Sequence, residues 1–232
     1  MISVIIPVYN EEPEIANTIN RVFENDVDKL VHEIIVSDGG STDNTDTAAA
    51  GAGARICRSV KKGRASQMNA GASMATGSIL YFLHADTIPP PAFSTAITNC
   101  VTRNRKAGCF MLAFDHEHWF LRLHSWFTRF NIDAIRFGDQ SLFLTKQLFE
   151  ETGGFDESLI VMEDQELVKR IRKLSGFVVI KQQVLTSARK YVENGVYKTQ
   201  LVFYLIFLMY QLGYSQRKLV QTYRRLLLQN KI

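Results

Sequence analysis

The chain of 232 residues is 46% hydrophobic and 22% charged, and its formal net charge is +4. A chain of this length buries roughly 70% of its unfolded surface, so it needs no disulfide or metal to hold a core. The composition excludes disordered, collagen-like and disulfide-rich proteins. The three cysteines, Cys57, Cys100 and Cys109, lack metal-binding spacing, which favours free thiols in a reducing cytoplasm.

Short apolar segments alternate with helical segments along most of the chain. We predict strands at residues 3–8, 33–37, 54–57, 78–83 and 109–114, and helices at 12–25, 45–50, 64–75 and 91–104. The alternation predicts an α/β fold with a mainly parallel sheet and helices on both faces. No Gly/Ser-rich linker divides the chain. We therefore expect one domain over residues 1–190 and a helical tail over residues 191–232.

Polar residues directly follow three of the predicted strands. The first strand ends in Pro7-Val8-Tyr9-Asn10-Glu11, the second in Asp38-Gly39-Gly40-Ser41-Thr42-Asp43, and the fourth in His84-Ala85-Asp86. Such residues are common in turns and at helix N-caps, and Asp43 is a candidate cap for the next helix. Because ligands of parallel sheets bind beyond the carboxyl ends of the strands, three such loops favour a binding site. Neither a G-x-G-x-x-G fingerprint in the first turn nor a P-loop occurs, which excludes those two modes of nucleotide binding.

Two further segments are candidates for the same site. Lys61-Lys62-Gly63-Arg64 precedes a predicted helix, where backbone N–H groups and basic side chains suit a pyrophosphate. Taken alone, this segment is more often a solvated basic turn. Glu163-Asp164 opens another predicted helix, where an acidic pair either offsets the helix dipole or supplies a general base. Spacing alone leaves these two alternatives even.

In their order along the chain, six motifs resemble inverting family 2 glycosyltransferases of the GT-A (Rossmann-like) fold. Over residues 3–175 they are Ile5-Ile6-Pro7-Val8-Tyr9-Asn10-Glu11, Asp38 to Asp43, Lys62-Gly63-Arg64 with Asn69-Ala70-Gly71, Leu83-His84-Ala85-Asp86, Gly153-Gly154-Phe155-Asp156 and Glu163-Asp164. The resemblance implies transfer of a sugar from a nucleotide-diphosphate-sugar to a hydroxyl acceptor, with inversion of configuration. The motifs L-H-A-D-T, F-G-D-Q and M-E-D in a short chain most resemble a bacterial subgroup linked to arsenosugar biosynthesis.

The resemblance also implies roles for the matched residues. Asp38 would accept hydrogen bonds from the base or ribose of the donor, above a pocket floor made by the turn from Pro7 to Glu11. Arg64 would lie near the diphosphate, and Asp86 would hold Mg²⁺ or Mn²⁺ between the phosphates. Asp164, with Glu163 beside it, would deprotonate the acceptor hydroxyl. The donor-binding residues implied in this way are Pro7, Tyr9, Glu11, Asp38, Gly63, Arg64, Asn69, Ala85 and Asp86.

The sequence departs from the family pattern at two places. The usual D-x-D is His84-Ala85-Asp86, so the first carboxylate is missing. His84 is then a weaker metal ligand, a nucleotide contact or a plain strand-end histidine, and the last two are favoured. No Q-x-x-R-W follows Asp164, which argues against a processive polysaccharide synthase. The missing aspartate keeps open a non-catalytic nucleotide-sugar-binding or scaffold protein, and a nucleotidyltransferase is a third alternative.

An aromatic segment lies between the metal turn and the acidic pair. Its apolar residues recur at helical spacing, which is typical of a core stripe: Trp119, Phe120, Leu123, Trp126, Phe127 and Phe130. In the family that the chain resembles, this region commonly shapes the acceptor pocket. Trp119, Trp126, Asp139 and Gln140 are therefore acceptor candidates.

The basic residues are concentrated at the C-terminus. Residues 189–232 have a net charge of +7, which leaves −3 for residues 1–188. Residues 201–212 are apolar all round, but a bilayer span needs about 20 such residues. We expect a buried, interfacial or subunit-contact helix there and an amphipathic basic helix over residues 216–229.

Two partners are considered for this tail. We prefer docking of the tail on its own domain or in a homodimer. Peripheral contact with the inner membrane is the second choice. It would suit a lipid-linked acceptor, whereas the alternative is a small-molecule acceptor. Nucleic acid is not expected, because the basic residues lack interleaved stacking aromatics. The N-terminus has no basic segment before its apolar run, so we expect no signal peptide and a cytoplasmic location.

Overall fold

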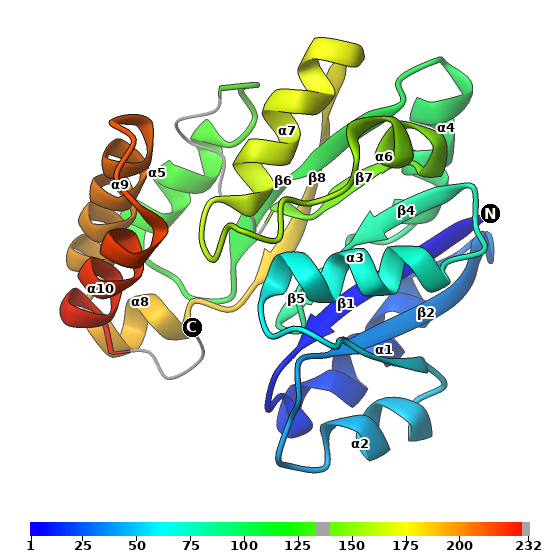
Figure 1. Cartoon of the computed structure of the whole chain (residues 1–232). Coiled ribbons are helices and arrows are strands. Elements are labelled where there is room, and N and C mark those ends of the chain that lie inside the picture. Colours follow the sequence, from blue (N-terminus) through cyan, green and yellow to red (C-terminus); the bar gives the residue numbers. More distant parts are fainter. Residues whose placement is uncertain (133–139, 229–232) are drawn as a thin grey trace.

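The computed structural model describes residues 1–132 and 140–228. An eight-stranded sheet in the order β3-β2-β1-β4-β7-β6-β8-β5 runs through these residues (Figure 1). The strands are β1 (Ile2–Val8), β2 (Val31–Asp38), β3 (Arg55–Arg58), β4 (Ile79–Phe82), β5 (Thr87–Ile88), β6 (Ala107–Phe114), β7 (Leu142–Thr145) and β8 (Phe177–Thr186). The helices are α1 (Glu12–Asn25), α2 (Thr45–Gly51), α3 (Arg64–Met74), α4 (Phe93–Thr102), α5 (Trp119–Phe127), α6 (Lys146–Thr152), α7 (Glu163–Leu174), α8 (Arg189–Asn194), α9 (Val196–Gln211) and α10 (Gln216–Leu226).

The sheet has a parallel half and a mixed half. β1 pairs with β2 and β4, and β2 pairs with β3, all in parallel. Beyond β4, β7 is antiparallel to both β4 and β6, β5 is antiparallel to β8, and β6 and β8 are parallel. The predicted α/β sheet is confirmed, with four parallel and three antiparallel pairings among the described strands.

The sequence analysis missed β5, β7 and β8. β5 has two residues and β7 has four, which is too short to show a period. In β8 the polar run Lys181-Gln182-Gln183 is exposed, and it interrupts the apolar pattern beside a register shift opposite Phe110 and Met111.

Two hydrophobic cores lie on opposite faces of the sheet. Alternation along β1 sends Val4 and Ile6 into one core and Ile5 into the other. The first core includes side chains of α1, α2 and α4, and the second includes side chains of α3, α6 and α7. Helices therefore cover both faces, as predicted, and the loops at the carboxyl ends of the parallel strands remain accessible.

The three C-terminal helices pack on the rest of the chain. Leu219 and Tyr223 of α10 are buried against Val202 and Ile206 of α9, and Met162, the residue before α7, packs against the same cluster. α8 and α5 share a second small cluster. Across the described residues, no helix combines the length and the apolar character that crossing a bilayer requires.

The aromatic stripe of α5 is not a core stripe, and that prediction is wrong. Trp119 is 58% exposed and Trp126 is 44% exposed. The helix instead buries Leu121, His124 and Ser125. The backbone explains part of this choice, because the hydroxyl of Thr128, at the end of α5, accepts a hydrogen bond of 3.0 Å from the backbone N–H of Leu112 in β6.

Candidate functional site

The loops after β1 and β2 are hydrogen-bonded into one rim. The backbone N–H of Gly39 donates to the carbonyl of Val8 at 3.0 Å. The backbone N–H of Asn10 donates to the hydroxyl of Ser41 at 2.9 Å, and its side-chain oxygen accepts from the N–H of Thr42 at 2.8 Å. The predicted donor-binding residues Pro7, Tyr9, Glu11 and Asp38 therefore share this rim, with Val8 directly opposite Asp38 in the sheet register.

Asp38 holds its own loop together. It is 4% exposed, and its carboxylate accepts hydrogen bonds from the N–H of Gly40 at 3.0 Å and from the N–H of Ser41 at 3.0 Å. The hydroxyl of Ser41 donates to the same carboxylate at 2.5 Å. Both carboxylate oxygens of Asp38 are thus already used to organise this turn.

The second acidic residue of this loop caps its own turn. The carboxylate of Asp43 accepts hydrogen bonds from the N–H and hydroxyl of Thr45 and from the N–H of Glu12. Burial acts to raise the pKa of Asp43, but these hydrogen bonds lower it below the usual value. Asp43 thus ties the start of α2 to the start of α1, in line with the structural role that the sequence left open.

Gln67, a residue that the sequence analysis missed, fastens the same rim from α3. Its side-chain NH₂ donates to the carbonyl of Val8 at 2.6 Å and to the carbonyl of Ser37 at 2.9 Å. A Cβ on Gly39 would lie 2.9 Å from Nε2 of Gln67, which accounts for glycine there. No sequence pattern distinguishes this buried glutamine from an ordinary helical one.

The start of α3 meets the start of α7. Gly63 has φ 123°, which favours glycine, and Arg64 is the first residue of α3. Nη1 of Arg64 lies 3.5 Å from Oε1 of Glu163, the first residue of α7. The Arg64 side chain is partly exposed, whereas that of Glu163 is buried. Arg64, the residue expected near the diphosphate, thus lies directly beside the acidic pair Glu163-Asp164.

Burial and neighbouring charges act on Glu163 in opposite directions. Burial raises the pKa of Glu163 above its usual value, and the positive charges of Arg64 and Lys190 oppose that rise. Lys190 of α8 therefore lies within electrostatic reach of Glu163, although the sequence analysis counted it only among the basic residues near the tail.

Asp164, the next residue of α7, is partly exposed at the same helix start. Leu167, Val168 and Ile171 anchor the helix in the second core.

The turn after β4 is anchored on both sides. The carbonyl of Ala85 accepts a hydrogen bond of 2.5 Å from the hydroxyl of Thr18 in α1. The carbonyl of Asp86 accepts one of 3.1 Å from the N–H of Ser187, which follows β8. Ala85 is buried, so its contribution is packing and backbone position, whereas Asp86 is partly exposed. The anchoring to Ser187 also brings the start of α8, with Lys190, toward this turn.

The turn after β4 offers one carboxylate, that of Asp86, to a metal ion. This suits a cation that phosphates of a bound nucleotide also coordinate. Among the described residues, no three or more His, Cys, Asp or Glu side chains are grouped to hold an ion. Mg²⁺ in nucleotide sites is commonly bound through one or two carboxylates together with substrate phosphates and water. One carboxylate on an anchored turn fits that arrangement.

Three of the remaining predicted residues serve other contacts in the structure. The amide of Asn69 pairs with the backbone of Phe155 through two hydrogen bonds of 2.9 Å, which tie α3 to the Gly153–Asp156 segment. Gln140 is 3% exposed, and its amide donates to the carbonyl of Phe110 at 3.2 Å. The Trp119 ring packs near Tyr197 of α9. Asp139 lies outside the described residues.

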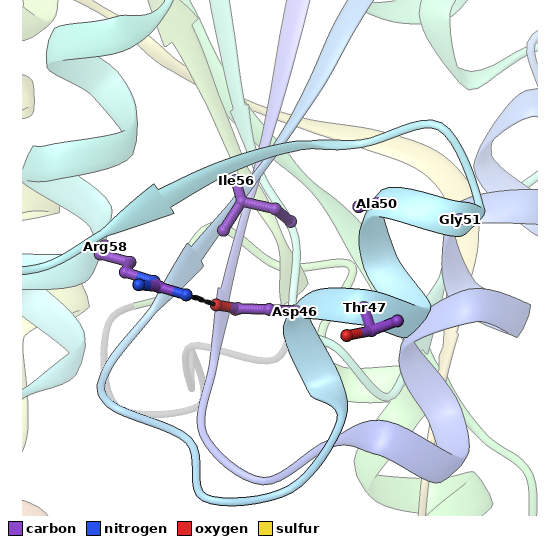
Figure 2. Close-up of a pocket in the computed structure, with 6 residues that line it drawn as sticks. All are labelled: Asp46, Thr47, Ala50, Gly51, Ile56 and Arg58. Carbon is purple, nitrogen blue, oxygen red and sulfur yellow. Dashed lines mark hydrogen bonds and ion pairs between the residues drawn. The ribbon is translucent and has the colours of Figure 1, made fainter.

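A surface depression of about 660 Å³ lies elsewhere, between α2 and β3 (Figure 2). Its lining consists of Asp46, Thr47, Ala50, Gly51, Ile56 and Arg58. An ion pair of 3.1 Å joins Asp46 and Arg58 across it. None of the six is a predicted site residue, so the chemistry of the chain points to the strand-end rim instead of this depression.

The fold and the comparisons together define the class of protein. The two-part sheet, with polar loops at the carboxyl ends of its parallel strands, is the GT-A fold of glycosyltransferases. The model of the family described as "Glycosyl transferase family 2" matches residues 3–155, and the chain belongs to this family.

One curated relative matches a limited stretch of the chain. Glucosyl-3-phosphoglycerate synthase of Mycobacterium tuberculosis is 35% identical over 97 residues, which cover 38% of this chain and 30% of that relative. The chain thus aligns with less than a third of the length of that relative.

Two solved structures share the fold at low identity. A mannosyltransferase from Pyrobaculum calidifontis, described as a complex with GDP-Man and Mn²⁺, matches with TM-score 0.70 and 18% identity over 88% of this chain and 61% of that one. The glucosyl-3-phosphoglycerate synthase of Mycobacterium tuberculosis, described with Mn²⁺, UDP and phosphoglyceric acid, matches with TM-score 0.62 and 21% identity over 92% and 78%.

Proposed function

We propose that this family 2 glycosyltransferase transfers a sugar from a nucleotide-diphosphate-sugar to a hydroxyl acceptor with inversion of configuration. The contact between Arg64 and Glu163 carries the proposal, because it puts a candidate diphosphate ligand beside the residue that precedes the candidate general base, Asp164. The solved relatives described with GDP-Man and with UDP support a nucleotide-linked donor for this chain as well.

The donor half of the site is built on the loops after the first two strands and on α3. The turn from Pro7 to Glu11 and the Asp38 loop form a rim for the nucleoside, held in position by Gln67. The Arg64 side chain and the backbone N–H groups at the start of α3 attract the diphosphate. Lys190 adds a second positive charge on the α8 side.

Asp86 is the residue that would hold a divalent cation together with the donor phosphates. Such a cation supplies Lewis-acid stabilisation of the departing diphosphate. The hydrogen bonds from Thr18 to the Ala85 carbonyl and from Ser187 to the Asp86 carbonyl hold the backbone of that turn in place before the donor arrives.

Asp164 is the proposed general base. Its carboxylate takes the proton of the acceptor hydroxyl while the acceptor oxygen forms a bond to the anomeric carbon. The bond from that carbon to the diphosphate breaks at the same time, and the diphosphate leaves with the electron pair. Attack from the face opposite the leaving group inverts the configuration. Glu163, buried and paired with Arg64, acts as a positioning residue for that arginine and not as a second base.

The identity of the acceptor and the subgroup within the family are two separate proposals. The relation to enzymes of arsenosugar biosynthesis rests on the short motifs alone. The relative described with phosphoglyceric acid offers a small anionic acceptor as a model, and a lipid-linked acceptor is the second candidate. Trp119, Trp126, Asp139 and Gln140 remain acceptor candidates from the sequence, although the amide of Gln140 is engaged with backbone carbonyls.

A thermal-shift screen followed by a turnover assay tests the proposal. Nucleotide-sugars are screened with Mg²⁺ or Mn²⁺, because a ligand at 100 times its Kd adds about 2.7 kcal/mol of stability. The donor found is then followed for release of nucleoside diphosphate, with and without candidate acceptors. Donor binding without turnover would support a binding or scaffold protein, and release of pyrophosphate would support a nucleotidyltransferase. Either result would contradict the proposal.

A further inference from the structure

Two helices carry exposed apolar stripes with matching spacing. On α5 and just beyond it the exposed residues are Trp119, Leu123, Trp126, Phe127 and Phe130. On α9 and the residue after it they are Tyr197, Leu201, Tyr204, Leu205, Leu208 and Leu212. In both stripes the residues follow each other at intervals of three, four or one, so each stripe covers a single helix face. We call these eleven residues the α5–α9 surface.

The two stripes meet at their N-terminal ends. The Tyr197 ring lies 6.3 Å from the Trp119 ring and 5.2 Å from the Phe120 ring, measured between centroids. Figure 1 shows α5 and α9 at the same end of the molecule, on the side away from α2. The α5–α9 surface is therefore a joined apolar patch, and soluble proteins rarely leave such a patch uncovered.

The charged residues on α5 and α9 themselves are positive, which favours an anionic partner. Arg122 and Arg129 are exposed on and beside α5, Lys198 is exposed on α9, and the Arg129 guanidinium lies 4.5 Å from the centre of the Trp126 ring. No Asp or Glu occurs in the sequences of α5, α9 or α10. A second copy of the chain would bring like charges together at this patch. Trp and Tyr beside Arg and Lys are instead typical of the boundary between lipid headgroups and acyl chains.

We propose that the α5–α9 surface binds the face of an anionic lipid bilayer, with its apolar side chains inserted at headgroup depth. The sequence analysis considered membrane contact for the whole tail over residues 191–232, whereas this proposal restricts the contact in the tail to α9 and adds α5. The apolar face of α10 is already buried against α9 through Leu219, Tyr223 and Leu227. That helix therefore supports the surface from behind, and α5 and α9 make the contact.

The packing links this surface to the catalytic helix. Met162 packs against the cluster that α9 and α10 form, and Glu163 follows it. Nζ of Lys169 in α7 also lies 5.0 Å from the centre of the Tyr210 ring of α9. Binding of α9 to a bilayer thus fixes the orientation of α7 relative to the membrane.

Vesicle flotation of the full chain tests the proposal. The wild type is expected to float with vesicles of phosphatidylcholine and phosphatidylglycerol and to bind less to vesicles of phosphatidylcholine alone. The double variant Leu201→Gln/Leu208→Gln is expected to lower the partition coefficient at least about tenfold, because two apolar side chains lose their insertion. The control Val60→Gln/Leu174→Gln changes two exposed apolar residues elsewhere and should float like the wild type.

A charge variant and a mass measurement complete the test. Arg122→Gln/Arg129→Gln/Lys198→Gln is expected to remove the preference for anionic vesicles, and circular dichroism confirms that each variant is folded. Equal flotation of Leu201→Gln/Leu208→Gln and its control would overturn the proposal. The proposal would also be overturned if the wild type floats with neither kind of vesicle. If it then forms a dimer, and Leu201→Gln/Leu208→Gln is a monomer, the α5–α9 surface is a subunit interface.

Discussion

Nη1 of Arg64 and Oε1 of Glu163 lie 3.5 Å apart, and each residue is the first of its helix. The N-terminal ends of α3 and α7 therefore converge, and both ends favour negative charge. Glu163 supplies one negative charge there, and Arg64 balances it. A diphosphate arriving at this place has to share Arg64 with a buried carboxylate, and this competition gives the first prediction.

Donor affinity should fall as the pH rises, and Glu163 should cause part of that fall. Burial raises the pKa of Glu163, and the Arg64 charge opposes the rise. A bound diphosphate adds negative charge near Glu163, raises its pKa further and so takes up protons. We therefore expect the donor Kd to rise with pH as Glu163 loses its proton, at pH values above the usual range of a glutamate, and we expect a flatter profile in Glu163→Gln. Isothermal titration calorimetry measures both. Glu24→Gln, which breaks an exposed ion pair with Arg21 on α1, is the control. An unchanged pH slope in Glu163→Gln would contradict the prediction.

Asp164→Asn should remove turnover and spare donor binding. Loss of a positioned general base typically costs about 10²–10⁴-fold in rate, whereas the proposed donor contacts come from other residues. The measurements are kcat from nucleoside diphosphate release and the donor Kd. Glu166→Gln changes a neighbouring carboxylate of the same helix that is paired with Arg170. It should keep kcat within a few-fold of the wild-type value, and an equal loss in both variants would point to a damaged helix instead.

Asp86→Asn should abolish the effect of divalent cations on donor binding. Asp86 supplies the one carboxylate of its turn, so Mn²⁺ alone should stabilise the wild type little, and donor with Mn²⁺ should stabilise it more than donor with EDTA. In Asp86→Asn the two donor conditions should give the same melting temperature. His84→Gln decides whether His84 is a ligand, and we expect it to retain the Mn²⁺ effect. A full Mn²⁺ effect in Asp86→Asn would exclude Asp86 from the cation site.

Lys190→Gln should weaken binding of the nucleoside diphosphate about tenfold, which is the order of one charge-assisted hydrogen bond. The reason is that Lys190 stands near Glu163, where the proposed diphosphate site lies. The loss should shrink at high ionic strength, because salt screens the charge. Lys173→Gln in the last turn of α7 removes an exposed positive charge about 15 Å along the helix from Glu163 and should leave the Kd unchanged. Equal Kd values for Lys190→Gln and the wild type would remove Lys190 from the site.

Stability at low pH should depend on Glu33, a buried carboxylate far from the site chemistry. Burial alone would raise the pKa of Glu33, but hydrogen bonds from the backbone and hydroxyl of Thr76, from Ser3 and from Arg55 lower it from 4.5 to about 2. A lowered carboxyl pKa stabilises the fold above the unfolded-state value, and this stabilisation is lost as the pH falls toward 2.

Urea denaturation at several pH values measures this effect. Glu33→Gln should lose about 3 kcal/mol near neutral pH, and the difference from the wild type should shrink below about pH 4.5. Glu24→Gln, which breaks an exposed pair with Arg21, should cost at most about 1 kcal/mol at any pH. A pH-independent loss in Glu33→Gln would mean that its hydrogen-bond geometry matters and its charge does not.

The elements in the first half of the fold could be predicted from short stretches of the sequence. The helix predicted over residues 12–25 is α1 with the same bounds, because its apolar residues Ile15, Ile19 and Val22 recur at helical spacing behind Pro13 and two acidic residues. The strand end at Asp38 and the turn that contains Asp86 were found for a similar reason, since an apolar run stops before each and polar residues begin. Neighbouring residues alone carry these signals.

The second half depends on distant partners. β7 has four residues and becomes a strand by antiparallel pairing with β4 and β6. The amphipathic pattern of α5 showed a stripe but not which side is covered. The structure buries His124 and Ser125 and exposes Trp126, because the helix docks on β6 through Leu121 and Thr128. Gln67 and Lys190 escaped the sequence analysis because their role exists only in the folded chain.

The sequence by itself determined the family motifs, the parallel order of the first strands and the residue types at their carboxyl ends. Each of these follows from short-range patterns and from the rule that parallel strands end at one edge of a sheet. The tertiary structure decided which of those residues meet. It paired Arg64 with Glu163, committed Asn69 and Gln140 to backbone contacts, and left the apolar sides of α5 and α9 uncovered. These outcomes depend on packing between segments far apart in the chain, which composition and spacing do not encode locally.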